Sequence, residues 1–222
     1  QRIIKNAFPE WTVRAEAFAD SPAWAIVRRA EEFQAGLILV GSHNRSALGR
    51  LMLGSVSQSV LHHASASVRI SRPSTRAADL PLHLVAGEDG SDDAAAALSA
   101  LAARTWPAGT TVHLVTAVDP AMATMGLWSL AGAATTDWVR DINLRSVAQL
   151  QAAGLTVLPS IAHGDPRRIL LNEAEHWQAG CIFVGARGLR SLERFFLGSV
   201  SSAVASRAHC SVEVVRSTPA SA

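Results

Sequence analysis

An internal repeat constrains the fold of this chain more than any other feature of its sequence. Pro22 and Pro166 are 144 residues apart, and the same shift places Gly54 on Gly198 without a gap. Between residues 20 and 72, about 21 of 53 positions are identical to their counterparts under this shift, far more than composition alone would give. The chain therefore contains two copies of one structural unit.

The two copies are not equally complete. The second copy is whole, whereas Gln1 falls opposite Arg145, so the first copy lacks its first half. We expect residues 1–72 to be the C-terminal half of a first domain, residues 73–81 a linker, and residues 82–217 a complete second domain. Because half of such a unit does not close a core alone, we expect the sequence to be a fragment. An intact mass near 23.4 kDa would contradict that expectation.

Short apolar runs alternate with helical patterns along the chain. Residues 37–40 and 181–184 are apolar at every position, as in a strand that is buried on both faces of a parallel sheet. A third apolar run at 82–86 leads into an Ala-rich helical stretch at 92–104. Residues 12–18 alternate in a way that predicts another strand. Strands that alternate with helices are typical of an α/β fold built on a parallel sheet.

The most informative local pattern is a glycine-bearing loop in the second copy. Gly185, Gly188 and Gly198 are separated by two and then nine residues, and Ser199 follows them. Glycines let a backbone approach a phosphate closely, and the free N–H groups at a helix N-terminus attract anions. The same residues also fit a tight turn followed by a helix cap. The first copy has Asn44 in place of the middle glycine, which predicts a weaker anion site there.

This composite pattern lies between a buried strand and a helix and is followed by a short last strand at 211–216. It resembles the ATP-binding signature of the universal stress protein family. The preceding stretch from His163, in which Pro166 opens a helix, is also similar to that family, and the resemblance covers nearly the whole chain. It implies a tandem repeat of an α/β unit of the adenine-nucleotide α-hydrolase type. Such a unit has a doubly wound, five-stranded parallel sheet with strand order 3-2-1-4-5.

The resemblance also implies that the second unit binds ATP, with Mg²⁺ on the phosphates. Asp89 matches the aspartate that contacts adenosine in the family, and Ala117 ends the next strand, which lines the adenine. Carried onto this sequence, the implied site consists of Asp89, Gly90, Ala117, Gly185, Arg187, Gly188, Gly198, Ser199 and Val200.

Charged residues near these positions admit more than one interpretation. At least one of Arg187, Arg190 and Arg194 is expected to reach a phosphate, although a solvated loop surface is the alternative. Asp89 could instead cap the helix that follows it. For Asp165 we favour a helix cap over a base for hydrolysis.

The composition excludes several classes of partner. The formal net charge is +2, with 20 basic residues spread among 18 acidic ones and no basic patch interleaved with aromatics, so nucleic acid is not expected. No apolar run reaches membrane-spanning length, so no membrane is expected either. Two cysteines cannot form a disulfide framework, which favours the cytoplasm. His62 and His63 would point to different sides of a helix and are not expected to bind a metal.

These patterns predict an ATP-dependent switch or scaffold of a stress response, with at most slow hydrolysis. By the resemblance, the strand at 67–71 is expected to pair with that at 211–215 about a pseudo-two-fold axis, and the protein is expected to form a homo-oligomer. Glu88, where the family usually has an apolar residue, and Asn44 favour an alternative, an interaction module without nucleotide. A third alternative, a hydrolase or nucleotidyl-transferring relative, would need a catalytic Lys, His or metal site at the strand ends.

Overall fold

The computed structural model describes residues 1–42, 53–73, 80–118, 134–189 and 197–217. Asn44, Arg190, Arg194 and most of the linker lie outside the described residues. The helices and strands are, in chain order, α1 (Arg2–Ala7), α2 (Pro22–Glu32), β1 (Leu37–Gly41), α3 (Ser55–His63), β2 (Ser67–Ser71), β3 (His83–Gly87), α4 (Asp92–Ala102), β4 (Thr111–Val118), α6 (Ala134–Ala152), β5 (Thr156–His163), α7 (Pro166–His176), β6 (Cys181–Gly185), α8 (Ser199–Arg207) and β7 (Ser211–Val215).

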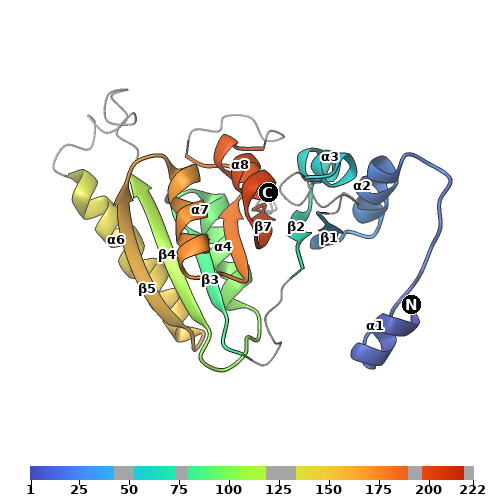
Figure 1. Cartoon of the computed structure of the whole chain (residues 1–222), viewed down its shortest axis with the longest axis horizontal. Helices are drawn as coiled ribbons and strands as arrows, with labels where there is room; N and C mark the ends of the chain where they lie inside the picture. Colours follow the sequence, from blue (N-terminus) through green and yellow to red (C-terminus); the bar gives the residue numbers. More distant parts are fainter. Residues whose placement is uncertain (43–52, 74–79, 119–133, 190–196, 218–222) are drawn as a thin grey trace, which may run out of the picture.

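The second unit is a doubly wound α/β layer structure. Its strands lie in the order β7-β6-β3-β4-β5 and are all parallel, which is the predicted order 3-2-1-4-5 counted from the opposite edge. Helices α4 and α6 cover one face of the sheet, and α7 and α8 cover the other (Figure 1). The apolar runs in the sequence form β3, β4 and β6 because a central parallel strand is buried on both faces.

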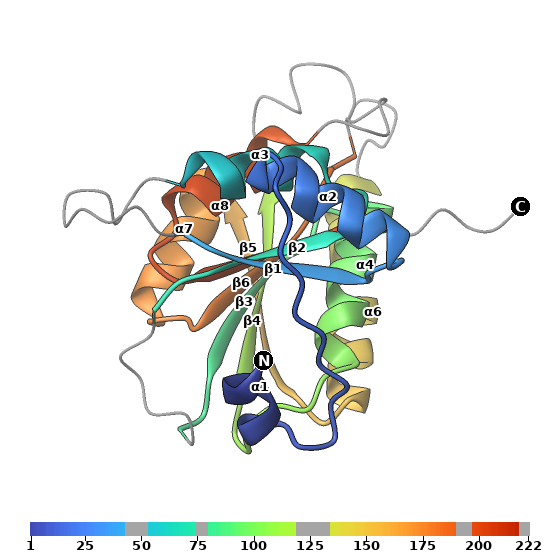
Figure 2. The same ribbon diagram turned by 90° about the vertical axis from the view of Figure 1, so that its right-hand side faces the viewer.

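The sheet does not end at β7. Strands β2 and β1 of the first unit continue it, so that the five strands of the second unit belong to one seven-stranded sheet (Figure 2). β2 pairs with β7 in antiparallel orientation, whereas β1 and β2 are parallel. One hydrophobic core crosses this boundary, since Val68, Ile70, Val212 and Val214 are each at most 1% exposed and belong to the same cluster. The partial first unit is therefore stabilised by the second.

The predicted strand at 12–18 is wrong, because these residues are irregular in the structure. A strand needs a hydrogen-bonding neighbour, and in the repeat this segment corresponds to β5, which pairs with β4. Among the described residues, no strand lies beside residues 12–18 in the way that β4 lies beside β5. α1, which precedes them, has no buried residue and lies apart from the sheet (Figure 1).

Helices long and apolar enough to cross a membrane are a separate structural question from the sheet. Within the described ranges, no helix is both long enough and apolar enough to do so.

Candidate functional site

A cavity of about 530 Å³ opens at the carboxyl ends of β3, β4 and β6. Doubly wound sheets bind ligands at this edge, beside the point where the strand order reverses. All of the predicted site residues except Gly90 line this one cavity: Asp89, Ala117, Gly185, Arg187, Gly188, Gly198, Ser199 and Val200. The fold thus brings together residues that are up to 111 positions apart, from Asp89 to Val200.

Asp89 and Gly90 form the turn between β3 and α4. Gly90 has φ +80, and a Cβ there would lie 2.7 Å from Ile142 Cδ1, so this glycine supports the turn and does not line the cavity. Asp89 Oδ1 accepts a hydrogen bond from Ser91 N at 3.0 Å. Ser91 Oγ caps α4 by accepting from Ala94 N at 3.2 Å, so the cap of this helix is Ser91 and not Asp89.

The loop glycines allow close approaches between chain segments. A Cβ at Gly185 would lie 2.7 Å from the backbone of Ala94, so β6 packs directly against the start of α4. A Cβ at Gly188 would lie 2.5 Å from Asp89 Oδ2, which shows that the Asp89 carboxylate lies against the glycine loop. These glycines therefore allow the loop to pack against α4 and Asp89, and they also keep side chains out of the cavity.

α8 begins at the cavity without a side-chain cap. Its N-cap residue is Gly198, with φ −64 and ψ 151, and among the described residues no side chain caps the first turn. Ser201 Oγ donates inside the loop, to Ala186 O at 2.8 Å. The N–H groups of the first turn, from Ser199 onward, are thus available to an anion in the cavity, where the helix dipole adds partial positive charge.

Arg187 lines the cavity, but its guanidinium is bound to a buried carboxylate. Nε lies 2.8 Å from Asp93 Oδ2 and Nη2 lies 3.0 Å from Asp93 Oδ1. Asp93 Oδ1 also accepts from Ser217 N and Oγ at 2.8 and 2.5 Å. Burial alone would raise the pKa of Asp93, but the hydrogen bonds from Arg187 and Ser217 outweigh it and lower that pKa. The arginine is therefore positioned at the cavity by α4.

Glu88 places a second buried carboxylate beside the cavity. Oε1 accepts from Gly90 N at 2.7 Å and Oε2 accepts from Ser146 Oγ at 2.6 Å, so this side chain joins the turn to α6. Burial raises the pKa of Glu88 above its ordinary value of 4.5, and the nearby Asp89 charge adds to the rise, which outweighs the lowering by the hydrogen bonds from Ser146 and Gly90. The ionised form of Glu88 is thus disfavoured by the fold.

The Glu88 geometry predicts a pH dependence of stability. The folded pKa lies above the unfolded one, so the contribution of this group is fully present below pH 4.5 and is lost as pH rises through the raised value. In Glu88→Gln, which keeps an acceptor for Gly90 N and a partner for Ser146, we expect the free energy of unfolding to fall less with rising pH than in the original chain. Urea denaturation from pH 4.5 to about 8 measures this; parallel curves for the two proteins would contradict it.

Asp165 caps α7, as the sequence predicted. It is the N-cap residue, and its Oδ1 accepts from Arg167 N at 3.0 Å. The Arg167 guanidinium also binds it, with Nε 2.8 Å from Oδ1, and this interaction lowers the pKa of Asp165. A carboxylate held in this way is a weak base, which counts against the hydrolase alternative.

Sequence reasoning missed part of the wall next to Ala117. Thr116, Trp138 and Val139 also line the cavity, and Thr116 Oγ1 accepts from Asn143 Nδ2 at 3.0 Å. Nothing in the sequence showed that α6, the helix that carries Trp138 and Val139, closes the cavity. Asp93 was also missed, since an acidic residue in a first helical turn is common on exposed surfaces.

Comparison with known proteins supports the assignment that the fold and the cavity suggest. A sequence profile described as "Universal stress protein family" matches residues 6–72 and 82–216. The chain belongs to the universal stress protein family. A universal stress protein of Mycolicibacterium smegmatis is 30% identical over 225 residues, which cover 97% of this chain and 74% of that relative.

Two other universal stress proteins differ in how much they share with this chain. One from Synechocystis sp. is 36% identical over 80 residues, which are 36% of this chain and 49% of the relative, so the match spans about half of that protein. The crystal structure of a universal stress protein from Archaeoglobus fulgidus superposes with a TM-score of 0.66 and 25% identity, covering 94% of this chain and 71% of that one. The similarity therefore extends over both units.

Proposed function

We propose that the second unit binds ATP, with Mg²⁺ on the phosphates, and acts as a nucleotide-dependent switch or scaffold in a cytoplasmic stress response. The observation that carries the proposal is that the uncapped start of α8 and the Asp89 turn, separated along the chain, line one cavity. One side of this cavity suits an anion and another offers a carboxylate to hydroxyl groups.

The described residues fit the parts of a nucleotide. The first-turn N–H groups of α8 and the Ser199 hydroxyl would donate to phosphate oxygens, and Gly198 leaves the backbone open to them. The Asp89 carboxylate would accept from the adenosine hydroxyls. Ala117 and Val118, at the end of β4, offer an apolar wall for the base. In the described part of the chain no group of three acidic, His or Cys side chains could hold a metal, so the phosphates would be the main ligands of Mg²⁺.

We propose a binding role and not a dedicated catalytic one. Among the described residues at the cavity, Asp165 is committed to capping α7, and Glu88 is committed to Gly90 and Ser146. Neither is placed as a general base that would activate water, so hydrolysis of bound ATP should be slow.

The first unit should bind nucleotide weakly or not at all. α3 begins after Gly54, which has φ −64 and ψ 152, nearly the same backbone geometry as Gly198. The first unit carries Asn44 where the second unit has Gly188, however, so its loop lacks the middle glycine. An uncapped helix start alone offers a phosphate too few contacts for tight binding.

We expect calorimetric titration with MgATP to detect one site per chain in the micromolar range. Gly198→Ala should weaken binding by about tenfold or more, because the new Cβ would lie 3.0 Å from Ala186 O and would displace the glycine loop from the geometry that a phosphate needs. The matched control is Gly54→Ala, which makes the same change at the same backbone geometry in the first unit and should leave the affinity unchanged.

Two results would contradict the proposal. One is the absence of binding by the original chain after co-purified nucleotide has been removed, which would favour the interaction module. The other is an equal loss of affinity in the Gly54 and Gly198 variants, which would place the site elsewhere. Circular dichroism of each variant checks that the fold is kept.

A further inference from the structure

The ladder between β2 and β7 is built on a pseudo-two-fold axis. We call this ladder the seam and define it as residues 68–70 with residues 212–214. Arg69 lies directly opposite Glu213, and the repeat shift makes Glu213 the counterpart of Arg69. Each of these residues therefore faces its own counterpart, which places the axis between them.

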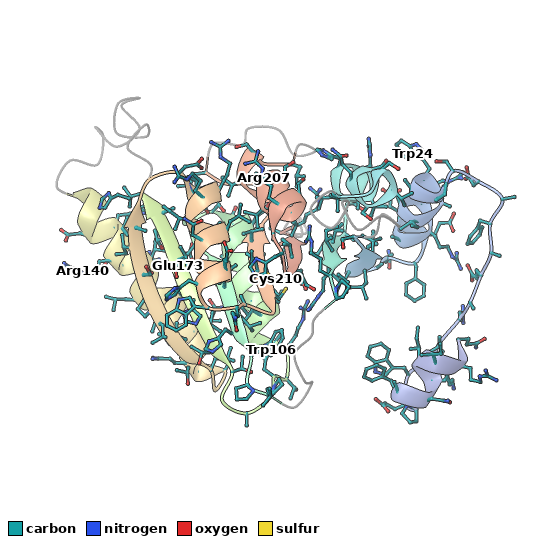
Figure 3. All side chains as sticks on the ribbon, in the orientation of Figure 1. Trp24, Trp106, Arg140, Glu173, Arg207 and Cys210 are labelled. Carbon is teal, nitrogen blue, oxygen red and sulfur yellow. The ribbon has the colours of Figure 1, made fainter. Side chains whose placement is uncertain are left out.

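The contacts on either side of the axis are reciprocal. Arg72 Nη2 donates to Ala205 O in α8 at 2.6 Å, and its counterpart Arg216 donates to Leu61 O in α3 at 2.9 Å. The backbone N–H of each arginine binds a serine hydroxyl at the start of the opposite strand, at 3.1 and 3.2 Å. Arg72 also donates to the carbonyl of Cys210, which Figure 3 labels beside β7. These reciprocal contacts, which lie away from the centre of the seam, could form equally well between two identical units.

The centre of the seam is not symmetric in charge. The Glu213 side chain is 1% exposed, and the Arg104 guanidinium binds both of its oxygens at 2.6 and 2.5 Å. Arg69 approaches from the first unit, with Nη1 3.6 Å from Oε2. One buried carboxylate thus lies between two guanidinium groups, one from each unit.

We propose that Glu213 makes the β7 edge selective for a strand that carries a cation at the axis, so that β2 of its own chain binds there and a second copy of β7 does not. A second copy would bring Glu213 opposite Glu213. Residues directly opposite in an antiparallel ladder have Cβ atoms about 5 Å apart, and like charges at that position are destabilising. Burial makes the repulsion stronger than it would be at an exposed ladder.

Arg104 does not remove this preference. It belongs to the same unit as Glu213, so a second copy would bring another carboxylate whose own arginine already binds both of its oxygens. The two carboxylates would still face each other across the axis. The cation that faces Glu213 across the axis comes from the opposite strand, where this chain has Arg69 and a second copy of β7 would have Glu213.

The test uses three substitutions at Arg69 in the full chain. Arg69→Glu creates in the seam the carboxylate pair that a second copy of β7 would form, Arg69→Gln is the neutral control, and Arg69→Lys keeps the charge. The readout is amide hydrogen exchange at residues 68–70 and 212–214, compared with amides of β3 and β4. We expect exchange in the seam to be about tenfold faster in Arg69→Glu than in Arg69→Gln, with Arg69→Lys close to the original chain.

Two outcomes would overturn the proposal. If the Glu and Gln variants exchange at the same rate, a second carboxylate is tolerated at the axis. If the Lys variant exchanges as fast as the Glu variant, the shape of the arginine and not its charge decides the pairing. Because the Arg69 side chain is 26% exposed, these variants should keep the fold, and unchanged exchange in β3 and β4 verifies that they do.

Discussion

Gly185→Val is expected to destabilise the second unit strongly. A Cβ at this position would lie 2.7 Å from Ala94 N and 2.7 Å from Asp93 C, and both of these atoms belong to the backbone of α4. Backbone cannot rotate away as a side chain can, so β6 and α4 would have to separate. Overpacking of this kind costs about 3 kcal/mol or more, a large part of the stability of a small domain. Urea denaturation followed by circular dichroism measures the loss.

The repeat supplies a matched control for this substitution. Gly41 is the counterpart of Gly185 at the end of β1, but it is exposed in this chain. Gly41→Val should therefore change the free energy of unfolding by less than about 0.5 kcal/mol. If both variants lost the same free energy of unfolding, valine at the end of the strand would be destabilising for a reason other than contact with α4.

Asp93→Asn should be the second most damaging substitution at the site. Asp93 is 3% exposed and accepts hydrogen bonds from Arg187 and Ser217, so the neutral amide would leave the Arg187 guanidinium without its partner charge. Breaking a buried ion pair from one side costs about 3 kcal/mol. Asp92→Asn, at the exposed neighbouring position, is the control and should have little effect.

The same carboxylate predicts sensitivity to acid. The folded pKa of Asp93 lies below its ordinary value of 3.8, so its contribution to stability is present above that pH and is lost as pH falls through the lowered value. Below about pH 4 the original chain should lose this advantage over Asp93→Asn, and the two denaturation curves should converge. A constant difference down to pH 2 would contradict this account. The window lies below the one expected for Glu88, so the two effects can be separated.

Much of the second unit could be predicted from the sequence because its signals are local. Apolar runs gave the strand positions, and the family resemblance gave the strand order that the structure confirms. All of the predicted site residues except Gly90 line the cavity, because they lie at strand ends or in the glycine loop, whereas Thr116, Trp138 and Val139 were missed. We predicted Gly90 as a site residue because it follows Asp89 in the motif. In the structure, Gly90 supports the turn, packs next to Ile142 and does not line the cavity.

The parts that could not be predicted depend on contacts between distant residues. Arg187 and Asp93 are 94 positions apart, and no sequence pattern joins them. Residues 12–18 have the alternating pattern of a strand but do not form one, because the pattern does not indicate whether a neighbouring strand exists. Glu88 was noted as a departure from the family pattern, yet its partner Ser146 lies 58 positions away in α6. Local patterns identify elements, whereas charge pairs and pairing partners require the fold.

The seam also has a consequence for biosynthesis. β2 leaves the ribosome before its partner β7, since the paired residues Ile70 and Val212 are about 140 positions apart. At ~5–20 residues per second, β2 waits roughly 7–30 s before its partner has been made. During that time Val68 and Ile70, which are fully buried in the native protein, have no partner from β7. Newly made chains should therefore depend on chaperones until β7 appears, and slow codons in the second half should lower the yield of folded protein.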